Sequence, residues 1–317
     1  MIRQAFYPIS RIAAFALLAA CGSPDDTGGA AAEAQSAGET ALYRYNREYV
    51  FVSPRGDEPL VVPFTFRSNE LGSELERGVR GWLARGATWD RFLDETGRTS
   101  QAGGVWRVVP LGDLRITAGG AAELESLRFE RAERRLRLEL DAPLTSWSQG
   151  GDTRFRLLSG TLAVGSETLS GPVLEMLRVE RTLEDGWPPG EDFDALFLTS
   201  GDSVQVVLAE TINGDGAAPE YAWVRTPGGE RSWQEAEIRW LEMRPYQDAR
   251  RDIPLGWSFR VPGAAVDGEL VAAGFDVVLG PERAGRRAVE IHYTVEGWVD
   301  LGSDRHEVTG MIRHTQQ

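Results

Sequence analysis

The sequence predicts an all-β protein built from two tandem antiparallel β-barrels of about eight strands each. Apolar and polar residues alternate with period two in many short segments, as where Leu136, Leu138 and Leu140 are interleaved with charged residues. This alternation is typical of strands with one face buried and the other in water. Turn sequences such as Pro227-Gly228-Gly229 separate the segments. Because so many strands would otherwise leave long unpaired edges, we expect each sheet to close into a barrel.

About sixteen segments fit the pattern of a strand. Besides 136–140 and 236–240, they are 43–52, 60–66, 105–109, 113–117, 124–130, 155–164, 174–181, 195–199, 203–210, 221–225, 257–261, 275–279, 289–301 and 307–314. We divide the chain near Ser166, into a first barrel over 42–165 and a second over 166–317. A barrel of this size is either filled by side chains or holds one small ligand.

One segment, 70–93, departs from the alternation. Its apolar residues recur at intervals of three and four, the period of an amphipathic helix: Leu71, Leu75, Val79, Trp82 and Leu83. The sequence therefore predicts a short helical insertion in the first barrel, with a break near Gly86. Such an insertion is either a lid over a cavity or a plug that covers an exposed barrel end.

The first twenty residues are typical of an export signal. Arg3 and Arg11 precede an apolar run over 12–20, which is too short to span a bilayer because a spanning helix needs about 20 residues. The run ends in Leu18-Ala19-Ala20-Cys21-Gly22, which resembles the lipobox of bacterial lipoproteins. We predict a signal peptide over 1–20 and lipidation of Cys21. The alternative is that Cys21 is an incidental small residue beside an ordinary cleavage site.

Segment 21–41 is small and polar, so it predicts a flexible tether between the lipid and the first strand. The residue after Cys21 is Gly22 rather than the Asp that resembles an inner-membrane retention signal. We therefore expect a protein of the cell envelope that is held in the outer membrane by its N-terminal lipid anchor and faces the periplasm. Since Cys21 is the only cysteine, no internal disulfide and no cysteine-based metal site are expected.

The charge of the chain excludes several classes of function. The formal net charge is −14, whereas nucleic-acid binding depends on clustered basic residues, so we expect no nucleic-acid partner. Every basic residue is an arginine, which excludes Schiff-base chemistry and a P-loop lysine. No nucleophile elbow or dinucleotide fingerprint occurs in a strand-turn-helix context. We expect no cofactor.

Three motifs near the C-terminus resemble a known family: Ile-Pro-Leu-Gly-Trp-Ser-Phe-Arg-Val-Pro over 253–262, Tyr-Thr-Val-Glu-Gly-Trp-Val-Asp over 293–300, and Glu-Val-Thr-Gly over 307–310. They are similar to the end of the AttH-like and carotenoid 1,2-hydratase family. The resemblance implies two tandem lipocalin-like (calycin) barrels. The family holds isoprenoid hydratases, cyclase-like relatives and many proteins of unknown role, so fold carries over more safely than chemistry.

The candidate catalytic residues lie on the segment 289–301. Its apolar residues share one face, and Glu290, His292 and Glu296 lie on the other. If the apolar face lines the barrel, the polar face points to solvent or to the neighbouring barrel; if the lumen is polar, these three residues form an acid/base group. A water-adding enzyme needs an acid to protonate an alkene and a base to activate water. Glu296 is the first candidate because it also matches the family's Glu-Gly step. No metal site is expected, because the spacing of the histidines fits none.

Aromatic residues of the second half are the candidate ligand-binding residues, with core packing as the alternative. They are Trp223, Trp240, Trp257, Tyr293 and Trp298. The sequence thus leaves three functions open. The first is binding or carrying a small hydrophobic molecule, such as a lipid or isoprenoid. The second is hydration or cyclisation of such a molecule, and the third is a structural envelope lipoprotein with filled barrels.

Overall fold

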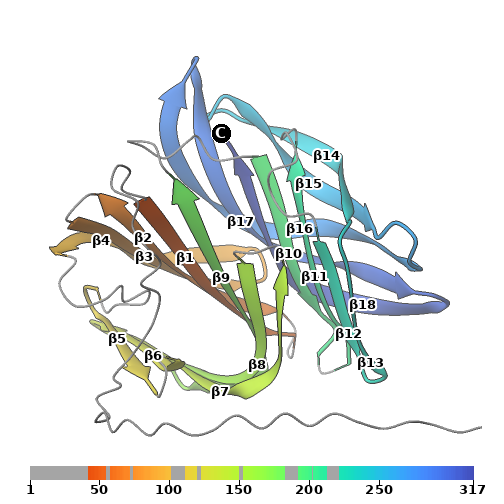
Figure 1. Cartoon of the computed structure of the whole chain (residues 1–317), viewed down its shortest axis with the longest axis horizontal. Coiled ribbons are helices and arrows are strands. Elements are labelled where there is room, and N and C mark those ends of the chain that lie inside the picture. The colour runs from red at the N-terminus through yellow and green to blue at the C-terminus, as the bar shows by residue number, and fades with distance from the viewer. Residues whose placement is uncertain are drawn as a thin grey trace, which may run out of the picture. The chain divides into compact units, whose positions relative to one another are not determined.

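The computed structural model describes residues 42–54, 58–71, 74–100, 111–119, 123–149, 153–182, 192–201, 203–212 and 221–317. Every regular element in these ranges is a β-strand, and the strands form two antiparallel sheets of nine (Figure 1). The predicted all-β class is therefore confirmed. The predicted signal peptide, the tether and Cys21 lie outside the described residues, as does the strand predicted over 105–109.

The first sheet contains β1 (Leu42–Ser53), β2 (Leu60–Leu71), β3 (Glu74–Arg85), β4 (Thr88–Ser100), β5 (Leu114–Ala118), β6 (Leu124–Arg131), β7 (Arg134–Gln149), β8 (Thr153–Val164) and β9 (Glu167–Thr182). The second sheet contains β10 (Asp192–Thr199), β11 (Gln205–Ile212), β12 (Tyr221–Thr226), β13 (Gly229–Trp233), β14 (Glu237–Tyr246), β15 (Arg251–Arg260), β16 (Val266–Arg283), β17 (Arg286–Leu301) and β18 (Asp304–Gln316).

The two sheets have the same topology. The strand order is β4-β3-β2-β1-β9-β8-β7-β6-β5 in the first and β13-β12-β11-β10-β18-β17-β16-β15-β14 in the second. In each, the chain begins in the middle of the sheet, runs outward by hairpins, and returns from the other edge until its last strand pairs with its first. Adding nine to a strand's number in the first sheet gives its counterpart in the second.

The predicted domain boundary at Ser166 is corrected by the pairing of β9. This strand follows β8 through the turn at Gly165 and pairs with both β8 and β1. It therefore completes the first sheet, and the connection to the second sheet falls after Thr182. The hairpin connection at Gly165 is a short turn within one sheet, and the alternation of side chains alone did not distinguish it from a division between domains.

The predicted helical insertion over 70–93 is wrong. The segment contains the end of β2, all of β3 and the beginning of β4, and Gly86 lies in the tight turn between β3 and β4 with a φ of 52°. The spacing of four between Leu75, Val79 and Leu83 is a multiple of two, so it fits one face of a strand as well as one face of a helix. Trp82 lies on the opposite face and is also fully buried, and this second buried face produced the apparent helical period.

Buried apolar residues form three layers. Each sheet has its own inner layer, around Tyr49 and Phe64 in the first sheet and around Trp257 and Tyr293 in the second. The third, which we call the joint layer, draws residues from both sheets, among them Phe155 from β8 and Phe197 from β10. Each sheet therefore uses one face for its own inner layer and part of the other face to pack against its neighbour.

Three contacts show how closely the sheets approach at the joint layer. Trp147 of β7 and Trp223 of β12 stack with ring centroids 4.1 Å apart and planes inclined by 6°. The turn after β3 rests on β16, because a Cβ atom on Gly274 would lie only 2.4 Å from the carbonyl oxygen of Ala87. Thr294 of β17 also donates a hydrogen bond of 2.8 Å to the carbonyl oxygen of Gly86. A side chain at position 274 would push the two sheets apart.

Candidate functional site

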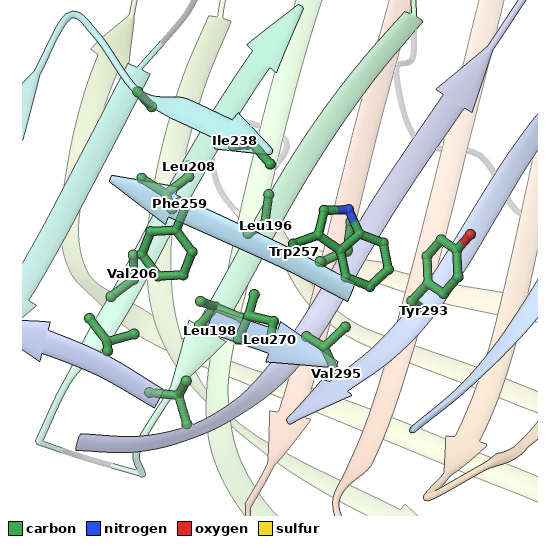
Figure 2. Packing of buried hydrophobic residues seen from close by; sticks show 14 of the residues in the cluster. Leu196, Leu198, Val206, Leu208, Ile238, Trp257, Phe259, Leu270, Tyr293 and Val295 are labelled. Carbon is green, nitrogen blue, oxygen red and sulfur yellow. The ribbon is translucent and has the colours of Figure 1, made fainter. Parts of the chain in front are cut away.

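The inner layer of the second sheet is apolar over most of its extent. Figure 2 shows the aliphatic side chains of β10, β11 and β16 facing Phe259 and Trp257, with Tyr293 at one side. The layer is built by strict alternation, since Leu196, Leu198 and their counterparts on β18 point inward while the intervening residues point to the joint layer. A polar side chain at an inward position is therefore removed from water and surrounded by hydrocarbon.

Two ionisable residues occupy such inward positions opposite each other. Asp194 of β10 is the cross-strand neighbour of His314 of β18, and both side chains are fully buried. Nδ1 of His314 lies 2.5 Å from Oδ1 of Asp194, and Nε1 of Trp240 donates a 2.8 Å hydrogen bond to Oδ2. Because a carboxylate accepts, Nδ1 of His314 donates to Asp194, and in the neutral imidazole Nε2 then carries the free lone pair. A buried aspartate that orients an imidazole in this way prepares it as a general base.

Further polar atoms around this pair lack hydrogen-bond partners among the described residues. They are Nε2 of His314, the hydroxyl of Tyr293 and Nε1 of Trp257. The ring of Tyr293 lies 6.5 Å from that of His314 and 4.9 Å from that of Trp257. Buried polar groups are nearly always hydrogen-bonded, so this cluster is suited to a ligand that supplies both a donor and an acceptor. We call these five residues the inner site: Asp194, Trp240, Trp257, Tyr293 and His314.

The hydroxyl of Tyr293 is held in its neutral form. Burial raises the pKa of Tyr293 well above its usual range, and the negative charge of Asp194 raises it further. The phenol therefore keeps its proton at all physiological pH values and can donate a hydrogen bond to a ligand.

An open pocket lies at one end of the inner site. It has a volume of about 390 Å³, and its lining includes Trp240 and Gln316 together with Tyr246, Arg250 and Arg251. Trp240 belongs to both regions, since it lines this pocket and also donates to Asp194. The side chain of Trp240 therefore separates the inner site from solvent.

The first sheet has a corresponding inner carboxylate that is saturated. Glu175 of β9 is buried and contacts the guanidinium groups of Arg47 and Arg156, and the hydroxyl of Tyr49 donates to it at 3.1 Å. All of its acceptor positions are thus directed at protein donors, an arrangement that stabilises the fold. This contrast between the two inner faces leads us to place the candidate site in the second sheet.

The structure places Glu290 and His292 in the joint layer rather than in the barrel interior. Arg67 and Arg80 of the first sheet bind Glu290 at 2.8 and 3.3 Å. His292 is fully buried, with Nε2 3.8 Å from Glu290 and its ring centroid 4.3 Å from that of Trp82. These residues therefore bridge the two sheets, which is one of the three directions that the sequence left open for this face of 289–301, beside solvent and a polar lumen.

Burial and charge shift the pKa of both residues in the joint layer. Burial raises the pKa of Glu290, but the positive charges around it, Arg67 first, outweigh burial and bring it to about 2. Burial lowers the pKa of His292 to about 4, against the opposing effect of Glu290. At neutral pH, Glu290 is therefore an anion between arginines, and His292 is a neutral ring against Trp82.

The other predicted site residues lie apart from these clusters. Glu296 is exposed. Trp298 is half-buried on the outer surface, where the guanidinium of Arg305 lies 3.8 Å from its ring centroid, and Trp223 stacks on Trp147 in the joint layer. Of the predicted ligand-binding aromatics, the structure brings Trp240, Trp257 and Tyr293 together.

Asp194 and His314 are two members of the inner site that the sequence did not single out. The available signal was a charged residue in an apolar position, since Asp194 is in phase with Leu196 and Leu198, and His314 with Ile312. Such a break in alternation marks a polar residue on a buried face. Among the described residues, no group of three His, Cys, Asp or Glu side chains is arranged to hold a metal ion. No helix long and apolar enough to cross a bilayer occurs in the same ranges.

The topology and the inner site together define a double lipocalin-like protein, with two antiparallel meandering sheets in tandem and a polar cluster inside the second. Two solved structures share this fold. The match to an AttH protein of Nitrosomonas europaea covers 86% of this chain and 91% of the AttH chain, with a TM-score of 0.56 and 14% sequence identity. The match to kievitone hydratase from Nectria haematococca covers 88% of this chain and 89% of the hydratase chain, with a TM-score of 0.56 and 15% sequence identity.

No family model matches the sequence, and no curated protein matches it. The resemblance to the AttH-like family that the C-terminal motifs indicate is confirmed by these structures at the level of the fold.

We predict that His292 makes the protein less stable as the pH falls from about 6.5 to about 4. The unfolded chain takes up a proton on His292 near pH 6.5, whereas the folded protein does so only near pH 4, so protonation favours unfolding in this window. The loss should approach about 3 kcal/mol. Glu290 should cause a separate loss between about pH 4.5 and pH 2, because its pKa is depressed in the folded state.

Urea denaturation of the wild type and of His292→Phe at several pH values between 7 and 4 measures this effect. The Phe variant should lose less stability than the wild type, and His306→Gln should behave as the wild type does. Equal losses in the wild type and in His292→Phe would contradict the assignment.

Proposed function

We propose that the protein binds a small, largely apolar molecule at the inner site of the second sheet. The observation that carries the proposal is the set of unpartnered atoms on His314, Tyr293 and Trp257 inside an otherwise apolar layer. The surrounding hydrocarbon favours an apolar body, and the free Nε2 and hydroxyl favour one hydroxyl or carbonyl group on that body. An isoprenoid alcohol or a lipid has this chemistry.

Tryptophan fluorescence during titration with farnesol and geranylgeraniol tests the binding. The wild type should show saturable emission changes from Trp240 and Trp257, because a ligand alters the surroundings of both indoles. Tyr293→Phe should weaken binding about tenfold, since it deletes one buried hydrogen bond and little volume. Trp298→Phe is the matched control, because it changes an aromatic residue outside the inner site. No change in emission with either probe, or equal affinities for the wild type, Tyr293→Phe and Trp298→Phe, would contradict this proposal. Either result would favour a structural protein whose inner layers are filled by side chains.

The Asp194–His314 pair favours a second candidate function, the addition of water to a carbon–carbon double bond that is conjugated to a carbonyl group of such a ligand, because the carbonyl oxygen then holds the negative charge until the proton returns. Nε2 of His314 takes a proton from a water molecule whose oxygen bonds to one alkene carbon. The Asp194 carboxylate stabilises the resulting imidazolium, which returns the proton to the other carbon. The net change is the addition of one water molecule, and the protein ends in its starting state.

Incubation of methyl farnesoate, whose double bond is conjugated to an ester carbonyl group, in water enriched in ¹⁸O distinguishes this activity from binding alone. A hydratase should give a product that is heavier by one labelled water, and His314→Gln should reduce the rate by at least about a hundredfold. The His306→Gln variant should keep the full rate. Unlabelled methyl farnesoate recovered intact after binding would identify a carrier rather than an enzyme.

We further propose that Cys21 carries acyl chains that hold the protein in the outer membrane, facing the periplasm. The support is the lipobox-like sequence, the short apolar run before it and the polar tether after it. In a Gram-negative host the wild type should fractionate with the outer membrane, and its N-terminal peptide should have the mass of an acylated Cys21. Cys21→Ser should be released into the soluble periplasmic fraction. An unmodified Cys21 in the mature wild type would overturn this assignment.

A further inference from the structure

Three arginines stand side by side on the outer face of the first sheet, where no packing demands them. Arg115 of β5 is the cross-strand neighbour of Arg128 of β6, which in turn is the neighbour of Arg137 of β7. All three side chains are exposed. Like charges directly opposite each other destabilise a sheet. Acidic residues outnumber basic ones over the whole chain, because its net charge is −14. A row of three guanidinium groups is therefore a local excess of positive charge.

The ion pairs of this row are weak or lacking. Arg128 contacts Glu130 at 2.7 Å and Arg137 contacts Glu139 at 2.6 Å, and these side chains are 41 to 60% exposed. Exposed ion pairs of this kind contribute little to stability and exchange readily. Among the described residues, the hydrogen bonds of Arg115 go only to two backbone carbonyl oxygens nearby. The three guanidinium groups can therefore redirect their N–H donors toward a ligand at a small cost in free energy.

The three arginines line an open groove with a volume of about 590 Å³. The groove also presents two hydroxyl groups, from Thr117 and Ser126, which are cross-strand neighbours in the adjacent row. Of its two carboxylates, Asp113 contacts Arg131, outside the lining, at 2.5 Å. Glu130 is shared between Arg128 of the row, at 2.7 Å, and Arg135 outside the lining, at 3.2 Å. Guanidinium and hydroxyl donors thus dominate the remaining surface.

We propose that this groove binds a phosphate group. Guanidinium groups present paired donors that match the oxygens of a phosphate, and hydroxyl groups supply further donors. A bound phosphate also relieves the repulsion within the row. The site is separate from the inner site of the second sheet, so it stands independently of the function proposed above. The phosphate is either that of a small soluble ligand or that of a lipid headgroup.

Calorimetric titration of the full chain carrying Cys21→Ser with inorganic phosphate and with glycerol phosphate tests the soluble source. Flotation of the same protein with phosphatidylglycerol vesicles, against phosphatidylcholine vesicles, tests the headgroup. The test variant is Arg115→Gln/Arg128→Gln/Arg137→Gln. The control is Arg98→Gln/Arg239→Gln/Arg305→Gln, which makes the same change in charge at three exposed arginines elsewhere.

The control protein should bind phosphate as the parent does, and the test variant at least about tenfold more weakly. Binding of the soluble phosphates identifies a small phosphorylated ligand, and binding only to phosphatidylglycerol vesicles identifies a headgroup. The test variant should remain folded, because it removes like-charge repulsion from an exposed face, and its urea midpoint checks this. Equal binding by the test and control variants in every arm, or no binding by the parent, would overturn the proposal.

Discussion

The rest of the structure depends on the burial of the joint layer between two sheets of the same topology. The side chains on one face of each nine-stranded sheet pack together in its inner layer. The central strands also carry apolar side chains on the opposite face, and these must be covered by another part of the protein. Here each sheet covers the other, with Trp147 stacked on Trp223 and the β3–β4 turn resting on Gly274. The ion pairs of Glu290 with Arg67 and Arg80 lie on the same faces. The joint layer thus holds the two sheets together. The residues of each inner face do not take part in that contact, so they can differ between the sheets.

The two inner faces do differ, and this difference carries the functional account. The first surrounds Glu175 with two arginines and a tyrosine hydroxyl, so its charge is neutralised within the protein. The second pairs Asp194 with His314, but one side of the imidazole, a phenol and an indole have no hydrogen-bond partner in the part of the chain that the structure describes. A saturated network stabilises a fold, whereas open donors and acceptors in hydrocarbon favour a ligand. The same topology therefore serves a structural role in one sheet and a proposed binding role in the other.

Much of the fold could be predicted from the sequence because alternation is a local signal. The strands at 43–52, 124–130 and 289–301 were found nearly to their ends. The segment 70–93 failed because a spacing of four fits a helix and a strand equally well. The site was harder to predict, since the contact of Asp194 with His314 joins residues far apart in the sequence. Trp257 and Tyr293 were identified as ligand-binding candidates from their type, while the direction in which His292 points depends on which face meets the other sheet.

The most direct test of the central claim is native mass spectrometry of the full chain purified from cells that produce it, followed by organic extraction. The account predicts one small apolar molecule per chain, bearing a single hydroxyl or carbonyl group, and its loss when Tyr293 and His314 are replaced by Phe and Gln. A mass that corresponds to the polypeptide without a bound small molecule, unchanged after exposure to a total lipid extract, would contradict it. That result would mean that the inner layer of the second sheet is closed and that its polar atoms serve the fold.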